Sequence, residues 1–309
     1  MIMKKVLVAG ATGYLGKYVV QELKKQGYWV RVLARNPKKL SQIGKFGEPA
    51  IAELVDEVFE GEVTQPETLK GIFDNIDWVF SSIGITRQKD GLTFWEVDYQ
   101  GNKNLLDLAV AEQIERFVFV SVFQGAELAG KIKVAQAREA FVKDLKASGL
   151  DYRIIRPTGY YSDMSEFMVM AQQGRVFVVG DGSGMINPIH GEDLARVCVQ
   201  AFQQDASVAR EIEAGGAEAF TYQEIGEMAF ELLSKKPRFT KLPVWLTKIM
   251  VAFIKPFNRQ QADLFSFFIT AAQNTALAPK YGGHHLKDYF IEFALQDGHE
   301  PHETLGIGG

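Results

Sequence analysis

The sequence predicts an α/β fold: a Rossmann-type, doubly wound parallel sheet followed by a smaller, mostly helical region. Apolar strand-like runs alternate with helix-length segments along the first half of the chain, which is typical of a parallel sheet covered on both faces. A glycine-rich turn at residues 10–16 joins the first strand to the first helix. We therefore expect a dinucleotide-binding domain over residues 1–157 and a substrate region over 158–309, with a return strand near 210–214.

The glycine-rich turn carries the strongest functional signal. It follows the apolar run Val6–Ala9 and precedes a segment with helical periodicity, and its glycines are spaced three residues apart. Glycine allows the backbone to approach a diphosphate closely, and the N–H groups that begin the following helix favour an anion. A glycine-rich turn can also be a plain connection, but this one lies in a strand–turn–helix unit. We predict a dinucleotide here, bound by Gly10, Thr12, Gly13, Tyr14, Leu15 and Gly16.

The end of the second strand, within Tyr28–Arg35, indicates which dinucleotide is bound. Enzymes that select NAD usually carry Asp or Glu at this point, where the carboxylate accepts hydrogen bonds from the adenosine ribose. This chain has Ala34 and Arg35 there, with Lys38 and Lys39 close behind. The alternative is a solvated basic loop, because Arg and Lys are common on surfaces. We predict that Arg35 binds a 2′-phosphate and that the cofactor is NADP(H).

The remaining elements follow in the order that a doubly wound sheet requires. Apolar runs at residues 57–60, 77–82, 116–121 and 152–156 predict four further strands, and the segments 94–112 and 134–148 predict helices between the last three. In such folds, ligands bind at the carboxyl ends of the strands. We therefore place at the site the residues that end the fifth and sixth strands: Ser121, Pro157, Thr158 and Gly159.

Composition and charge narrow the function classes. The net charge is −4, and basic residues are spread along the chain, which gives little support to a nucleic-acid or anionic-membrane role. The single cysteine, Cys198, excludes an intrachain disulfide and a thiolate zinc site, and it fits a reducing cytosol. No secretory signal and no apolar run of about 18 residues is recognisable. We expect a cytoplasmic protein without a membrane span.

The histidines do not suggest a metal centre. His190 precedes a helix and is expected to form hydrogen bonds at the junction of loop and helix. His284 and His285 are adjacent and so face apart, while His299 and His302 lie in a glycine-rich tail. None of these pairs has the i, i+4 spacing that aims two ligands at one ion. We expect no bound metal.

A second apolar stretch, residues 243–272, has no counterpart in the first half of the chain. It is rich in aromatic side chains and is interrupted by residues such as Lys248, Lys255 and Asp263, which predicts two amphipathic helices. One interpretation is core packing or a homodimer contact. The other is a wall or lid over a large apolar substrate.

These motifs together resemble a known family. The glycine turn, the basic end of the second strand, residues 148–159 (SGLDYRIIRPTG) and residues 187–194 (NPIHGEDL) are similar to the atypical and extended short-chain dehydrogenase/reductase superfamily, in its NmrA-like branch. Residues 281–290 most resemble divinyl chlorophyllide reductase-like members. The resemblance implies that a turn beside the adenine and the backbone after the fourth strand also contact the cofactor. The residues so implied are Glu62, Val63, Ser82, Ile83 and Gly84.

The resemblance also exposes a departure. Members that reduce carbonyls generally use Tyr-x-x-x-Lys, in which the lysine lowers the tyrosine pKa and binds the nicotinamide ribose. Counted back from residue 148 as in the family, these positions hold Val134 and Arg138. Arg138 can supply charge and ribose contacts, but it is a poor proton shuttle. Tyr160, Tyr161 and Ser121 are the candidates for a relocated catalytic role, with Tyr160, Arg138 and Ser121 preferred.

Three functions are compatible with this pattern. The first is an NADP(H)-dependent oxidoreductase that transfers hydride to an apolar or conjugated small molecule, for which a dedicated acid matters less when a conjugated double bond is reduced. The second is a non-catalytic NADP(H) sensor or assembly factor of the NmrA-like type, which the missing pair favours. A sugar-nucleotide epimerase or dehydratase ranks last, because such enzymes normally keep the Tyr-Lys pair.

Overall fold

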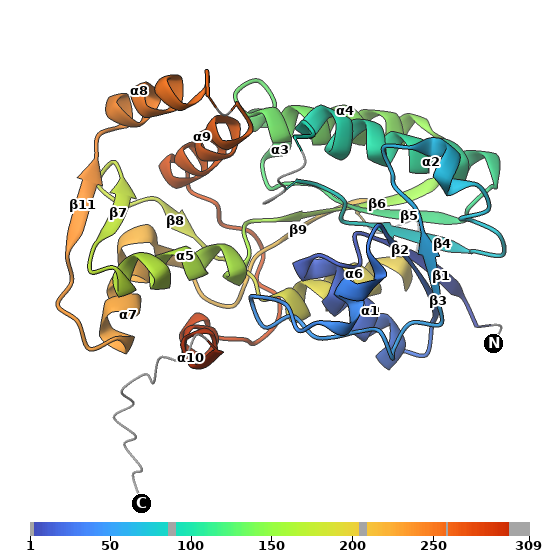
Figure 1. Ribbon diagram of the computed structural model, residues 1–309, viewed down its shortest axis with the longest axis horizontal. Helices are drawn as coiled ribbons and strands as arrows, with labels where there is room; N and C mark the ends of the chain where they lie inside the picture. Colours follow the sequence, from blue (N-terminus) through green and yellow to red (C-terminus); the bar gives the residue numbers. More distant parts are fainter. Residues whose placement is uncertain (1–2, 86–90, 204–208, 258, 297–309) are drawn as a thin grey trace, which may run out of the picture.

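The computed structural model describes residues 3–85, 91–203, 209–257 and 259–296. It divides into a sheet with helices on both faces and a second region built around smaller sheets (Figure 1). Among the described residues, no helix combines the length and the apolar character needed to cross a membrane. His299 and His302 lie outside the described residues.

A seven-stranded sheet, parallel throughout, forms the first region and confirms the predicted fold class. Its order is β3-β2-β1-β4-β5-β6-β9, so the strand order reverses beside β1, next to the glycine turn. Such a reversal opens a crevice at the carboxyl edge where ligands bind. The last strand, β9, pairs with β6 in parallel. The strands are β1 Lys5–Ala9, β2 Trp29–Ala34, β3 Glu57–Glu60, β4 Trp78–Ser81, β5 Arg116–Val120, β6 Asp151–Pro157 and β9 Glu211–Ala214.

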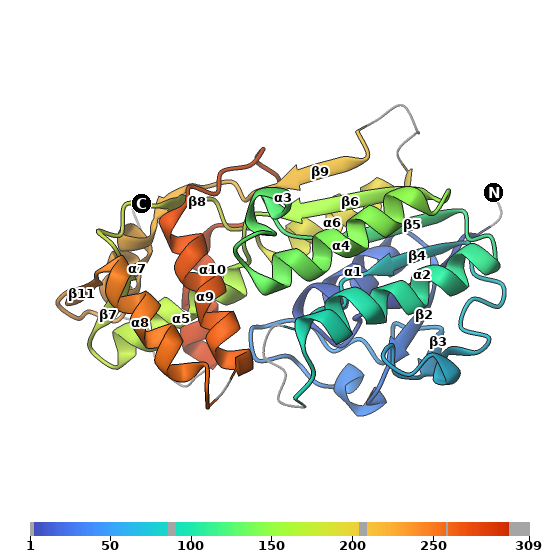
Figure 2. The same ribbon diagram turned by 90° about the horizontal axis from the view of Figure 1, so that it is seen from above.

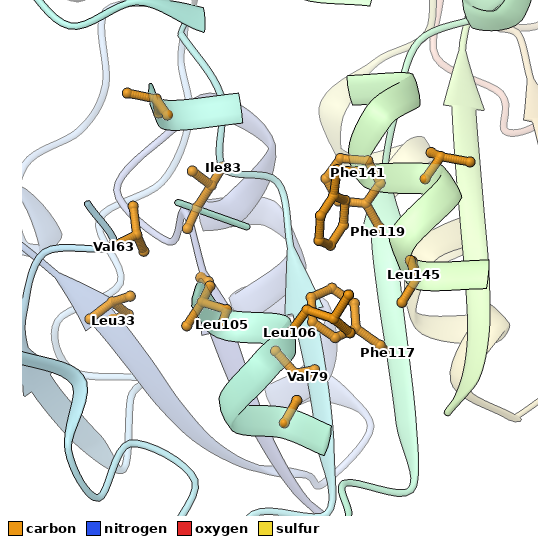
Figure 3. Close-up of a cluster of buried hydrophobic side chains, with 14 of the residues drawn as sticks. Leu33, Val63, Val79, Ile83, Leu105, Leu106, Phe117, Phe119, Phe141 and Leu145 are labelled. Carbon is orange, nitrogen blue, oxygen red and sulfur yellow. The ribbon is translucent and has the colours of Figure 1, made fainter. Parts of the chain in front are cut away.

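Helices cover both faces of this sheet. Helices α1 (Tyr14–Lys25) and α6 (Gly191–Gln203) pack together on one face, and α2 (Asn102–Ala111) and α4 (Lys133–Ala147) cover the other (Figure 1). Each face has its own core of buried apolar side chains, and Figure 3 shows the one that joins strands β4 and β5 to α2 and α4. Because the strands are apolar on both sides, the sheet is buried on both sides.

The predicted helix over residues 94–112 differs from expectation in its first part. Residues Trp95–Gly101 form a π-helical segment, and a regular α-helix begins only at Asn102. A Cβ on Gly101 would lie 2.8 Å from a methyl carbon of Val63, so the segment packs closely on the turn after β3. Its Asp98 side chain is fully buried. Wide turns of this kind are frequent at functional sites.

The second region is mostly helical and has a separate core. Helices α5 (Tyr161–Gln172), α7 (Tyr222–Leu232) and α10 (Leu286–Gln296) enclose a third cluster of buried apolar side chains. Thr221 and Glu224 form the expected capping box at the start of α7. Strand β7 pairs with β11, and β8 pairs with β10. These strands are β7 Val176–Val179, β8 Met185–Ile186, β10 Phe220–Thr221 and β11 Phe239–Leu242.

The two helices predicted over residues 243–272 are α8 (Val244–Ile254) and α9 (Arg259–Gln273). They pack against each other, and α9 lies between α8 and the rest of the molecule (Figure 1). Helix α9 also contacts α4 of the first region. Short helical turns complete the structure: α3 Gly125–Leu128 and the 3₁₀ turns Pro37–Ser41 and Pro66–Leu69.

Candidate cofactor and substrate site

The glycine turn is held in a shape that only glycine permits at two positions. Gly10 has a φ of +90°, and its carbonyl accepts a hydrogen bond of 3.0 Å from the N–H of Gly13. A Cβ on Gly16 would lie 2.1 Å from the Gly10 carbonyl oxygen, so α1 packs directly on the turn. Gly13 precedes α1 without a side-chain cap, which leaves backbone N–H groups at the head of the helix for an anion.

A cavity opens over this turn, beside the point where the strand order reverses. It includes most of the residues predicted from the glycine turn and from the three strand ends beside it. Leu33, Gly61 and Val97 also line it and were not predicted; only Gly61 had a sequence signal, as part of the turn after β3. The predicted residues that line it are Gly10, Thr12, Gly13, Arg35, Glu62, Val63, Ser82, Ile83 and Gly84.

The basic side chain predicted to choose the cofactor lies at one end of this cavity. Arg35 follows β2 and is half exposed, and its Nη1 lies 3.2 Å from Oε2 of Glu62. A cation and a carboxylate therefore share the position where an adenosine ribose or its 2′-phosphate would bind.

Tyr14, Leu15 and Gly16 begin α1, and none of the three lines the cavity. Leu15 and Gly16 are buried within the helix packing. The Tyr14 hydroxyl accepts a hydrogen bond of 3.1 Å from the Gly191 N–H, and its ring packs 5.8 Å from that of Tyr160. These three residues are therefore placed to contribute backbone groups rather than side chains to a bound diphosphate.

A second cleft, largely apolar, lies at the carboxyl ends of β5 and β6. It contains the predicted residues at these strand ends and on α4, and α9 forms one wall of it, so the α9 part of residues 243–272 lies where a substrate wall was considered. The predicted residues that line it are Ser121, Arg138, Pro157, Thr158, Gly159 and Tyr160. Those that sequence reasoning missed include Ile85, Phe94, Phe123, Gln124 and Asp163.

A buried ion pair lies where the two cavities meet. Arg138 on α4 donates from Nε to Oδ1 of Asp98 over 2.8 Å, and Oδ2 of Asp98 accepts from the Ile85 N–H over 3.0 Å. Gly84 is pressed against this pair, since a Cβ there would lie 2.0 Å from the Arg138 guanidinium. Burial raises the pKa of Asp98, and the charge of Arg138 opposes that shift. The pair fixes the strand end that borders both cavities.

Ser121 and Thr158 use their hydroxyls within the protein. The Ser121 hydroxyl donates to Glu139 over 2.9 Å, and Glu139 is bound in turn by Arg156 over 2.6 Å. The Thr158 hydroxyl donates to the Asn187 carbonyl over 2.6 Å. Both residues therefore help to shape the cleft through side chains that already have protein partners.

The two tyrosines considered for proton transfer are in different environments. Tyr160 lines the cleft, and burial raises its pKa, so it is a neutral hydrogen-bond donor near pH 7. The Tyr161 hydroxyl instead donates to the His284 carbonyl over 2.7 Å, inside the helical region. Tyr160 is thus the tyrosine whose position agrees with the predicted catalytic role.

His190 and His284 lie close together, although their spacing in the sequence did not indicate it. Ligand atoms of His190, Glu192 and His284 lie within 4.8 Å of one another. However, the two imidazole rings are stacked, with their centroids 4.1 Å apart and an angle of 21° between the ring planes. The nitrogen lone pairs lie in these planes, so they point side by side rather than toward one ion. His190 Nδ1 accepts from the Glu192 N–H, and His284 Nδ1 lies 2.9 Å from Asp193. The geometry favours a hydrogen-bonded cluster.

With this geometry in place, comparison with known proteins defines the family. A family model described as NAD(P)H-binding matches residues 10–205, and the chain belongs to this family. It is 26% identical over 285 residues to the photosystem II assembly factor Ycf39 of Synechocystis, which covers 90% of this chain and 84% of that protein.

Two further comparisons support the same class. The chain is 27% identical over 267 residues to the chloroplastic divinyl chlorophyllide a 8-vinyl-reductase of Arabidopsis thaliana; the match covers 81% of this chain and 62% of that relative. In fold, it is similar to an NADPH-dependent quinone oxidoreductase of Escherichia coli solved with NADPH, with a TM-score of 0.69, 17% identity and 96% of each chain covered. The resemblance to the short-chain dehydrogenase/reductase superfamily and its NmrA-like branch is thus confirmed.

Proposed function

We propose that the protein is an NADPH-dependent reductase of an apolar, conjugated small molecule. In this proposal, residues 1–157 hold the cofactor, and residues 158–309 supply about half of the residues that line the substrate cleft. The observation that carries it is the adjacency of the two cavities: Gly84 lines the one over the glycine turn, and Ile85 and Arg138 line the apolar one under α9. A nicotinamide bound from the first cavity would enter the second, where its hydride becomes available to a substrate.

Glycine geometry supports the cofactor assignment. The tight approach of α1 to Gly10 and the uncapped N–H groups at the head of α1 suit a diphosphate. Thr12 and Gly13 border the same space, and Gly84 and Ile83 would contact the ribose on the nicotinamide side. The residues present therefore fit a dinucleotide.

Arg35 supports NADP(H) over NAD(H), and it also provides a test. Replacing Arg35 with Ala should weaken NADPH binding about tenfold and leave NADH binding nearly unchanged, because only NADPH carries the 2′-phosphate. Glu62→Gln should strengthen NADPH binding, since it removes a negative charge beside that phosphate. Calorimetry with both dinucleotides measures these differences. Equal losses for the two dinucleotides in Arg35→Ala would contradict the preference.

Val134 and Arg138 at the positions of the family's Tyr-Lys pair support a conjugated substrate. Arg138 is bound to Asp98, and a guanidinium is a poor proton shuttle. Hydride addition to a conjugated alkene gives a delocalised anion, which water or a neutral phenol such as Tyr160 is able to protonate. The relative that is a vinyl reductase supports the same class of substrate.

The direct experiment follows NADPH oxidation by absorbance with enones, quinones and porphyrin-type alkenes. Ala271→Trp should abolish turnover of the active substrate while NADPH affinity stays unchanged, because Ala271 lines only the apolar cleft. Ala50→Trp, at an exposed position remote from both cavities, is the matched control. If NADPH binds but no substrate class oxidises it, the reductase proposal is wrong.

The second candidate is a non-catalytic NADP(H)-dependent assembly factor. Arg138 stands at the position of the family's catalytic lysine, and its ion pair with Asp98 already engages that side chain, which favours this candidate. The relative named as an assembly factor also favours it. A sensor of this kind should distinguish NADP from NADPH in calorimetry and change its affinity for a protein partner. A reductase should instead bind its small molecule only with the dinucleotide present.

A further inference from the structure

Helix α8 exposes its most apolar side chains to solvent. Thr247 is the only residue of this helix that is fully buried, while Trp245 is 64% and Phe253 72% exposed. Ile249 lies between them, one turn from each, so the three form a stripe along the outer side of the helix. Phe257, just beyond the helix, is 90% exposed. An ordinary surface helix has the opposite arrangement, with its apolar face toward the core.

The same segment concentrates positive charge. Residues 232–262 contain seven Lys and Arg and neither Asp nor Glu, although the whole chain has a net charge of −4. This segment is therefore a local exception to the spread of basic residues along the chain. Lys248 is exposed on α8 and Lys255 is exposed directly after it, and Lys131 lines the same groove as Lys248. Among the described residues, no carboxylate forms an ion pair with any of these three lysines.

The apolar face lies one helix away from the substrate cleft. Figures 1 and 2 show α8 and α9 side by side at the edge of the molecule, with α9 on the inner side. Phe267, Phe268 and Ala271 of α9 line the cleft. Asn274 lines both the groove between α8 and α9 and the cleft. A surface that covers α8 therefore lies close to the cleft.

We propose that α8 binds peripherally to an anionic lipid surface, with Trp245, Ile249, Phe253 and Phe257 in the headgroup region and the lysines on the phosphates. Aromatic and aliphatic side chains on one face with lysines at its margin are the features of an interfacial helix. A second copy of the chain fits less well, because a twofold contact through this face brings its lysines together with those of the partner. The proposal concerns attachment and does not depend on the reductase proposal.

Flotation with lipid vesicles tests the attachment directly. The full-length protein should float with phosphatidylcholine vesicles that contain about 30% phosphatidylglycerol, and at least tenfold less with phosphatidylcholine alone; added salt should remove the difference. The intrinsic fluorescence should shift to the blue on binding, and Trp245→Phe should remove most of that shift. The double variant Trp245→Ser, Phe253→Ser should lose flotation. Lys248→Gln with Lys255→Gln should lose the preference for anionic lipid.

Exposed apolar residues elsewhere give the matched control. Ile43→Ser with Phe177→Ser removes two side chains that are also exposed but lie outside α8, and it should float like the unaltered protein. Unchanged NADPH affinity in every variant shows that the fold is intact. The proposal is wrong if the unaltered protein fails to float on anionic vesicles, or if the α8 variant floats equally well. It is also wrong if ultracentrifugation shows that the unaltered protein is a dimer that does not bind vesicles and that the double variant Trp245→Ser, Phe253→Ser is a monomer.

Discussion

The two cavities of this protein are built in different ways. The one over the glycine turn depends on backbone: Gly10, Gly16 and Gly84 each lie where a Cβ would meet another group within 3 Å. The apolar cleft depends on side chains that come from β5, β6, α4 and α9, which are far apart in the sequence. We therefore expect the backbone-built cavity over the glycine turn to tolerate few substitutions at its glycines, and the apolar cleft to change shape when one of its side chains is replaced.

The largest effect should come from Gly16→Ala, which tests the backbone-built cavity. The new methyl group would lie 2.1 Å from the Gly10 carbonyl oxygen, and neither backbone is free to move without unpacking α1. We expect a loss of about 5 kcal/mol of unfolding free energy and no measurable NADPH binding. Gly130→Ala is the control, because a Cβ there meets no other atom within 4 Å. Denaturant unfolding and calorimetry measure both; equal behaviour of the two variants would contradict the prediction.

The junction of the two cavities should show the next largest effect. Asp98→Asn leaves the buried guanidinium of Arg138 without a counter-charge, which should cost about 3–4 kcal/mol of unfolding free energy. Urea unfolding measures it. Asp107→Asn, in the exposed ion pair with Lys103, should cost less than about 0.5 kcal/mol of unfolding free energy. If Arg138→Met does not recover stability in the Asp98→Asn background, the loss is not caused by the unpaired charge.

A pH-dependent effect is expected where the two regions are joined, at His190. Burial lowers the His190 pKa from 6.5 to about 4, so the unfolded chain takes up a proton before the folded one does. The stability that depends on neutral His190 is complete above pH 6.5 and is lost as the pH falls from 6.5 to 4, by at most about 3 kcal/mol.

His190→Gln should flatten the dependence of stability on pH in this window, whereas His285→Gln, at an exposed position, should not. Unfolding at a series of pH values gives the two slopes. A slope that is unchanged in His190→Gln would assign the acid sensitivity to other groups.

The smallest effect concerns a side chain of the apolar cleft. Thr158→Val keeps the shape of the residue and removes the hydrogen bond to the Asn187 carbonyl, which should cost about 1 kcal/mol of stability. NADPH affinity should stay the same, because the hydroxyl is already donated within the protein. A clear loss of NADPH affinity would instead place this hydroxyl on the cofactor, as the sequence predicts.

The difference between the cavities also explains what the sequence was able to reveal. The glycine spacing and the run Val6–Ala9 are local, and so the strand, the turn and the helix could be predicted together. Arg35 was identified from its place after the second strand, and Glu62 from the resemblance of its turn to the family's turn beside the adenine. The pairing of these two side chains was not foreseen, because it depends on β2 and β3 being neighbours in the sheet.

The cleft was less accessible to sequence reasoning. Residues 243–272 were recognised as helical and apolar, but their pattern does not tell which face meets α4 and which meets solvent. The stacking of His190 on His284 joins residues that are far apart in the chain, and no periodicity reports it. Nor does any local pattern distinguish the π-helical turn at Trp95–Gly101 from the α-helix that follows it.

The late strand β9 has a consequence for biosynthesis. A ribosome releases residues 151–157 well before residues 211–214, so β6 remains an open edge of the nascent sheet while α5 and α6 are still being made. Arg156 likewise lacks one of its ion-pair partners until Glu211 is made; in the folded protein its Nε lies 2.8 Å from Oε2 of Glu211. An interrupted translation product that stops between these points would therefore present an unpaired strand and a half-neutralised arginine to chaperones and to other nascent chains.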